Sequence, residues 1–163
     1  MSKSSWDQAD ERGMQLALQE ARTSFEQGGI PIGACLIVLN DSEPSGYKVL
    51  GSGHNQRIQR SSATLHGEIS ALENVGRLKA EVYRRATMYT TLSPCHMCTG
   101  AILLYNIQRV VIGENTTFMG GEDLLRQRGV ELVVLDNQEC KDLMASFISA
   151  HPEEWNEDIG QET

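Results

Sequence analysis

Residues 87–100, TMYTTLSPCHMCTG, begin as a buried strand and continue into the start of a helix near Pro94. Cys95 and Cys98 stand three positions apart, so both thiols fall on one face of that helix. His96 is turned away from them by about 100° and is expected to point elsewhere. Because two thiols cannot fill a four-ligand zinc site, any further ligand must come from another part of the chain.

Outside this stretch, the pattern of apolar residues predicts an opening hairpin followed by alternating helices and strands. Ser4 or Ser5 is expected to cap a first helix with apolar positions at Met14, Leu18, Ala21 and Phe25. The expected later elements are strands over 33–40, 47–55, 87–92, 109–113 and 130–136, and helices over 65–76, from near 94, around 124 and over 137–150. This order predicts a three-layer α/β/α sandwich with a mixed five-stranded sheet.

Size and charge restrict the classes of function. The 163 residues suit one domain spanning 1–163, and 14 basic against 22 acidic residues give a net charge of −8. Such a charge disfavours tight binding to nucleic acid, and no apolar run is long enough to cross a membrane. The first residues lack the apolar core of a signal peptide, so we expect a cytoplasmic or nuclear location. In that reducing environment a Cys-x-x-Cys pair favours metal binding or redox work.

The sequence TLHGEIS, residues 64–70, offers the missing ligand. His66 stands at the start of one expected helix, as Cys95 and Cys98 stand at the start of the next. Helix N-termini favour thiolates, and one histidine with two cysteines leaves a fourth zinc position for water, which is typical of a catalytic site. Glu68, two residues after His66, is placed to exchange protons with that water. Cys35 and Cys140 fall in apolar patterns and are expected in the core.

Together these residues form the pattern H-x-E…P-C-x-x-C, which is typical of zinc nucleobase deaminases. The chain resembles the cytidine and deoxycytidylate deaminase superfamily, and within it the fungal cytosine deaminases. The resemblance covers nearly the whole chain and rests on these segments: GGIPIGACLI, GHNQR, SATLHGEIS, YTTLSPC, MCTGAI, VVIGEN and WNEDIG. It implies hydrolytic deamination of free cytosine and 5-substituted cytosines to uracil and ammonia, in pyrimidine salvage, by a zinc-bound hydroxide.

The resemblance also implies roles for individual residues. His66, Cys95 and Cys98 would bind one Zn²⁺ per chain, with Glu68 as the catalytic proton carrier. Pyrimidine binding would fall to Asn55, Asp158, Phe118 and Trp155, with the C-terminal tail folded over the active site. Backbone donors near Gly67 and the carbonyl of Ser93 could hold polar groups of the reacting base. The family is homodimeric, and a homodimer is expected here.

Several alternatives stay open. Where the familiar family sequence has Asp and two aromatic residues, this chain has His96, Ile58 and Asn156, and its loop at 41–48 is longer. Ser93 could equally be a simple turn residue before Pro94, and the acidic tail could be a solvated segment. Deamination of tRNA adenosine, a nucleoside or guanine is the rival within enzymes. A structural zinc, with a fourth ligand from His96 or a partner, is the rival outside them.

Overall fold

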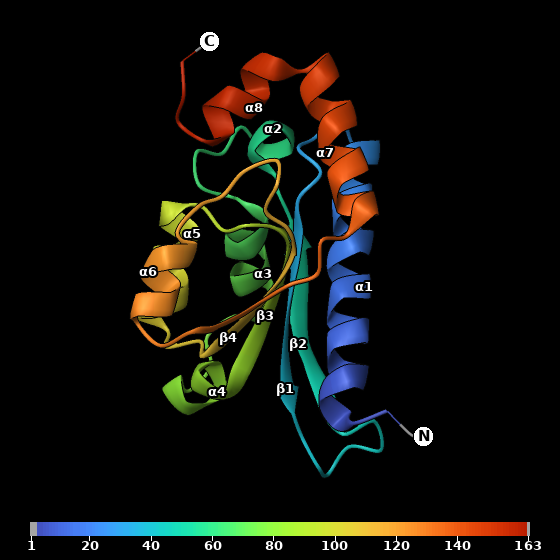
Figure 1. Ribbon diagram of the computed structural model, residues 1–163, viewed down its shortest axis with the longest axis vertical. Helices are drawn as coiled ribbons and strands as arrows, with labels where there is room; N and C mark the ends of the chain where they lie inside the picture. Colours follow the sequence, from blue (N-terminus) through green and yellow to red (C-terminus); the bar gives the residue numbers. More distant parts are fainter. Residues whose placement is uncertain (1–2, 163) are drawn as a thin grey trace.

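The protein contains a five-stranded mixed sheet with helices on both faces (Figure 1), as the sequence predicts. The structure is a computed structural model that describes residues 3–162. The sheet order is β2-β1-β3-β4-β5. Strand β1 pairs antiparallel with β2 and β3, whereas β3, β4 and β5 are parallel. The strand bounds are β1 Gly33–Leu39, β2 Tyr47–His54, β3 Ala86–Leu92, β4 Arg109–Glu114 and β5 Glu131–Val134.

Helices α1 and α7 cover one face of the sheet, and α3, α5 and α6 cover the other (Figure 1). On the α1 side a buried cluster joins Met14, Leu18, Ile37, Tyr89 and the α7 thiol Cys140. A larger apolar cluster fills the other side. The helix bounds are α1 Ser5–Glu26, α2 Arg57–Arg60, α3 Gly67–Val75, α4 Ala80–Arg85, α5 His96–Leu104, α6 Glu122–Gln127, α7 Gln138–Ala150 and α8 Pro152–Asp158.

Helix α1 begins as expected, but the last position of its buried stripe differs from the prediction. Ser4 caps it in a capping box with Asp7, in which each side chain accepts from the other residue's backbone N–H. The apolar stripe was predicted to end at Phe25, and this prediction is wrong, because Phe25 is 40% exposed. Ser24 occupies the buried position instead and is fully buried.

Three short helices, α2, α4 and α8, were not expected from the sequence. Helix α4 contributes Tyr83 as its one buried residue, so its six residues carry no apolar period that could be recognised. Helix α2 has four residues, none of them buried, and ends at Ser61 in the left-handed region with φ 50°. It lies beside α8 at one end of the sheet (Figure 1).

A third apolar cluster occupies that same end of the sheet. It consists of Ile30, Ile32, Leu92, Met144, Phe147 and Trp155. It therefore joins the segment before β1, the end of β3 and helices α7 and α8. This packing brings the C-terminal residues against the ends of the parallel strands, where sites in α/β proteins usually lie.

Candidate active site

Three side chains that could hold a metal ion meet where two helices begin. His66 is the N-cap of α3 and Cys95 the N-cap of α5, while Cys98 lies in the first turn of α5. Their ligand atoms all lie within 4.8 Å of one another. Both N-caps have extended backbone, and neither side chain caps its own helix, so the imidazole and the thiol remain available to a ligand. His96, in contrast, is exposed.

The two thiols differ in their protonation. A hydrogen bond from Cys98, aided by His66, lowers the pKa of Cys95 to about 4 despite burial. The same thiolate, together with burial, raises the pKa of Cys98 well above its ordinary value. Burial alone would lower the pKa of His66, but Cys95 and the carboxylates of Asp158 and Glu68 raise it overall. One thiolate is thus stable among these groups, and a bound cation would stabilise the second.

The donor set fits a zinc ion. Sγ of Cys95 lies 3.5 Å from Nδ1 of His66. Bonds of about 2.3 Å to sulfur and 2.0 Å to nitrogen at a tetrahedral angle give a separation of about 3.5 Å between such atoms. Nε2 of His66 faces away from the thiols and lies 3.5 Å from Oδ1 of Asp158. A carboxylate behind a ligating imidazole holds the ring orientation and the tautomer.

Glu68 is buried beside these ligands, in the first turn of α3. Thr90 of β3 donates its hydroxyl to Oε1 of Glu68 at 3.0 Å. Burial, together with the charge of the Cys95 thiolate, raises the pKa of Glu68. The carboxyl group is therefore held beside the metal-binding cluster, where it can accept and return a proton. Sequence reasoning missed Thr90, which is indistinguishable from the other threonines of its strand.

A second polar pair comes from distant parts of the chain. Asn55 follows β2 and Asp158 ends α8, and Nδ2 of Asn55 donates to Oδ1 of Asp158 at 2.8 Å. Oδ1 of Asn55 accepts from the backbone N–H of Arg57 at 3.0 Å, which fixes which way the amide faces. Both residues of the pair are buried. Among the described residues, Oδ2 of Asp158 accepts no hydrogen bond, so it can meet a ligand.

Burial also affects the protonation of Asp158. It raises the pKa of Asp158, although His66, Asn55 and Arg57 act in the opposite direction. The nearest guanidinium nitrogen of Arg57 lies 3.9 Å from Oδ1. The hydrogen bond from Asn55, with the two cationic groups nearby, orients the carboxylate through Oδ1 and leaves Oδ2 free of a hydrogen bond among the described residues.

A small cavity of about 10 Å³ lies between His66, Glu68, Cys95 and Asp158, whereas Asn55 and Cys98 do not line it. It is lined by Ile32, His66, Glu68, Leu92, Ser93, Cys95, Phe118, Trp155, Asp158 and Ile159. A volume of this order holds about one water molecule. The rings of Phe118 and Trp155 meet edge to face with centroids 6.0 Å apart. Ile32 and Leu92 were not singled out in the sequence, since an apolar lining residue has the same pattern as a core residue.

Gly67 and Ser93 stabilise the walls of this cavity. A Cβ at Gly67 would lie 3.0 Å from the carbonyl oxygen of Ile32, so a larger residue would displace that lining residue. The hydroxyl of Ser93 accepts from the backbone N–H of Gly120 at 3.0 Å. The backbone N–H of Ser93 donates to Glu114 at 3.0 Å. Ser93 thus connects the metal-ligand helix to the loop that carries Phe118.

A larger cavity of about 520 Å³ lies away from these groups, over α3, α4 and α5. Its lining includes Leu72, Leu78, Tyr83, Leu104 and Tyr105. It contains none of the metal-binding cluster, so its size alone does not make it the reaction site. Between residues 3 and 162, no helix has both the length and the apolar character needed to cross a bilayer.

Comparison with known proteins gives a consistent result. The model of the cytidine and deoxycytidylate deaminase zinc-binding region matches residues 7–114. A cytosine deaminase of Candida albicans is 59% identical over 152 residues, covering 93% of this chain and 97% of that protein. A solved structure from work on tRNA:A34 deaminases has a TM-score of 0.65 at 27% identity, covering 82% of this chain and 99% of that one.

A structure of guanine deaminase from Nitrosomonas europaea has a TM-score of 0.67 at 20% identity, covering 85% of this chain and 84% of the other. At that identity the likeness shows the fold alone. The family match spans more than half of the 163 residues and includes all three metal-binding side chains and Glu68. The chain therefore belongs to the cytidine and deoxycytidylate deaminase family.

Proposed function

We propose that this chain hydrolyses free cytosine, and 5-substituted cytosines, to uracil and ammonia. One observation carries the proposal: the buried Asn55–Asp158 pair lies directly against the His66, Cys95 and Cys98 cluster. The identity of 59% with the Candida albicans cytosine deaminase over almost the whole chain supports it. A role in pyrimidine salvage and a cytoplasmic or nuclear location belong to the same proposal.

His66, Cys95 and Cys98 would hold one zinc ion per chain. When bound, zinc supplies a Lewis acid that lowers the pKa of water and so provides a nucleophile near neutral pH. Glu68 accepts a proton from the attacking water and delivers it to N3 of the ring. The oxygen bonds to C4, and Glu68 then takes the remaining proton from that oxygen and passes it to the amino nitrogen. The bond from C4 to nitrogen breaks, ammonia leaves, and the oxygen remains as the carbonyl of uracil.

Asp158 would select the free base. Cytosine has an N–H at N1, where a nucleoside carries its sugar, and Oδ2 of Asp158 is available to accept from that N–H. The same carboxylate would clash with ribose, so one residue both favours the base and rejects the nucleoside. Asn55 would hold the neighbouring edge of the ring, and Phe118 and Trp155 would enclose its faces.

Polar backbone groups would complete the binding of the ring. Gly67 and Cys95 stand at helix starts, where free backbone N–H groups favour negative charge that develops in the transition state. The carbonyl of Ser93 would accept from the departing amino group.

The C-terminal tail would act as a cover. The cavity of about 10 Å³ holds about one water molecule, so a pyrimidine requires movement of its walls. Trp155, Asp158 and Ile159 all line it and all belong to the final segment. We infer that α8 opens for entry and release and that the whole chain, 1–163, works as one domain.

A homodimer is part of the proposal. Leu104 is 72% exposed and Tyr105 is 40% exposed, and both border the larger apolar cavity over α3, α4 and α5. An exposed apolar area of this kind suits a second copy of the chain. Light scattering at micromolar protein should give twice the chain mass, and a monomer would refute this part.

One rival has an observation in its favour, namely the similarity to the structure from work on tRNA:A34 deaminases. That enzyme class must bind a polyanion, whereas this chain carries a net charge of −8. Asp158 would also face the ribose of any polynucleotide. We therefore place tRNA second.

The deciding experiment measures ammonia release by zinc-loaded protein from cytosine, cytidine, adenosine, guanine and a tRNA transcript in parallel. Cytosine should be turned over and the other substrates should not. Glu68→Gln should abolish turnover while keeping the zinc content, because Glu68 is not one of the three clustered ligands. Turnover of cytidine or tRNA in preference to cytosine would overturn the proposal, as would an active Glu68→Gln variant.

A further inference from the structure

Asn55 depends on a polar network that reaches α1. Its backbone N–H donates to the carbonyl of Ile32 at 2.9 Å, and its side chain is held by Asp158 and by the N–H of Arg57. Its carbonyl accepts from the hydroxyl of Ser24 at 2.9 Å. Between residues 3 and 162 no other donor to that carbonyl is found.

Ser24 is a polar residue on a face that otherwise packs apolar side chains. It is fully buried and ends the buried stripe of α1 after Ala17, Leu18 and Ala21. Its hydroxyl lies 2.7 Å from the carbonyl oxygen of Ile30 as well as 2.9 Å from that of Asn55. A hydroxyl has one hydrogen, so Ser24 shares it between two carbonyls. It thereby joins the segment before β1 to the residue after β2.

A neighbouring glutamine holds Ser24 in this role. Nε2 of Gln59 donates to the Ser24 hydroxyl oxygen at 3.0 Å and lies 3.3 Å from Oε1 of Gln27. With a lone pair of its oxygen occupied by Gln59, Ser24 directs its hydrogen towards the carbonyls. Gln59 belongs to α2, so the network includes the short helix that follows Asn55.

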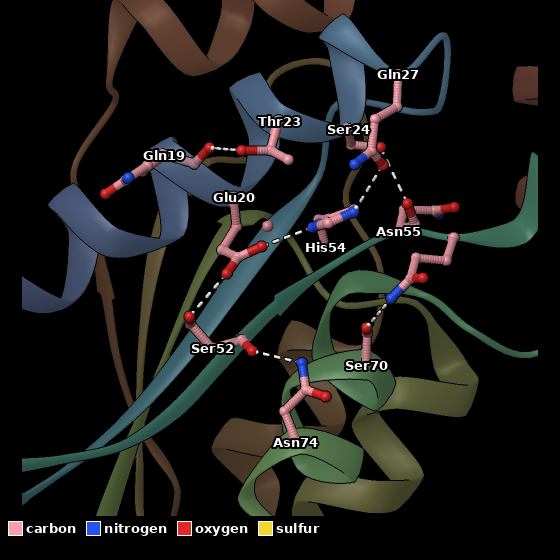
Figure 2. A network of polar contacts seen from close by, with 12 residues as sticks. Gln19, Glu20, Thr23, Ser24, Gln27, Ser52, His54, Asn55, Ser70 and Asn74 are labelled. Atoms are coloured by element: carbon pink, nitrogen blue, oxygen red, sulfur yellow. Dashed lines mark hydrogen bonds and ion pairs between the residues drawn. The ribbon is translucent and has the colours of Figure 1, made fainter. Parts of the chain in front are cut away.

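Helix α1, which carries Ser24, also fixes His54, the residue before Asn55. Nδ1 of His54 lies 2.6 Å from Oε2 of Glu20, and its Nε2 lies 3.1 Å from Oε1 of Gln27. Figure 2 shows Glu20 and Ser24 of α1, and Gln27 just after its end, pointing towards the end of β2. The two adjacent residues, His54 and Asn55, are therefore held by one face of one helix.

We propose that Ser24 is a positioning residue, which sets the Asn55 amide against Asp158 and so determines the affinity for the pyrimidine. This inference rests on the cytosine deamination proposed above. Within residues 3–162 the Ser24 hydroxyl is hydrogen-bonded to Ile30, Asn55 and Gln59 and not to Glu68 or the three clustered side chains, so the chemical step should be little affected. The expected result is a loss of binding rather than of turnover.

The test compares Ser24→Ala with Ser24→Thr, which keeps the hydroxyl, and with Ala9→Gly. Ala9 is also fully buried on α1, and glycine there loosens the helix without touching the network. Removing one shared buried donor should raise KM for cytosine about tenfold, with kcat within about twofold of wild type. Ser24→Thr should restore KM, and Ala9→Gly should leave it unchanged.

Hydrogen exchange followed by mass spectrometry supplies a readout that does not need turnover. Exchange over residues 52–60 should become faster in Ser24→Ala and should stay at the wild-type rate in Ala9→Gly. Unchanged KM and exchange in Ser24→Ala would overturn the inference, as would an equal KM rise in Ala9→Gly. If wild-type protein fails to deaminate cytosine, the proposed function falls, and the exchange comparison alone still decides the role of Ser24.

Discussion

Replacing Asp158 by asparagine tests how this protein would recognise a free base. Asparagine has almost the same shape, and its oxygen can still accept from Nδ2 of Asn55, which lies 2.8 Å from Oδ1. The change affects Oδ2, which becomes an amide NH₂ group that points into the cavity. This group would meet the N1–H of cytosine donor to donor, and the negative charge on the site would be lost.

The expected size follows from the hydrogen bonds concerned. A hydrogen bond to a charged acceptor contributes about 1.5–3 kcal/mol and a neutral one about 1 kcal/mol. Losing the charge and adding a second donor should therefore cost about 2 kcal/mol, which corresponds to roughly a thirtyfold fall in kcat/KM. Cytidine should not become a good substrate, because the side chain keeps its volume.

The assay is steady-state deamination of cytosine and cytidine by Asp158→Asn, with Glu157→Gln as the matched control. Glu157 is an exposed acid on the same helix, so this variant loses the same charge without touching the cavity. Glu157→Gln should stay within about twofold of wild type, as expected for a surface change. If Asp158→Asn also stays there, or if both variants fall equally, Asp158 does not bind the substrate.

Three further predictions concern the metal, the polar network and the backbone. Cys95→Ser should bind far less zinc than wild type, whereas His96→Ala should keep the full amount. Metal analysis after dialysis measures both zinc contents, and equal contents in the two variants would refute the assigned ligands. Glu20→Gln should lower the free energy of unfolding by about 1 kcal/mol at neutral pH. Its hydrogen-bonded histidine holds the pKa of Glu20 below the ordinary 4.5, so the stabilisation is present above that pH and is lost as the carboxylate is protonated. Urea unfolding should thus show the two proteins converging in acid, and a constant difference would contradict the assignment. Gly120→Ala should destabilise by about 2 kcal/mol or more in thermal unfolding, because a Cβ would collide with the backbone oxygen of the residue before Cys95. At Gly100 an added Cβ meets open space, so Gly100→Ala should raise the free energy of unfolding by about 0.5–1 kcal/mol. Similar effects of the two variants would refute this account.

The metal cluster could be predicted from the sequence because its geometry is mostly local. Cys95 at the N-cap and Cys98 in the first turn belong to one helix start, and His66 likewise stands where a helix opens. The Asn55–Asp158 pair could not be found in this way, since 103 residues separate its members. Only the resemblance to known deaminases connected them, because neither an asparagine after a strand nor an acid in an acidic tail stands out alone.

Ser24 shows why some of the network stayed hidden. Apolar periodicity reports which residues avoid water. It predicted the buried positions of α1 correctly through Ala21 and then predicted Phe25, which is 40% exposed. At the end of this helix the buried surroundings are backbone carbonyls, of Ile30 and Asn55, and a hydroxyl satisfies them where a phenyl ring cannot. A buried serine with partners on two distant segments has the same local pattern as an exposed one. Its importance becomes apparent only when the chain has brought those carbonyls together, and this is why residues that position a site are harder to predict than residues that bind a metal.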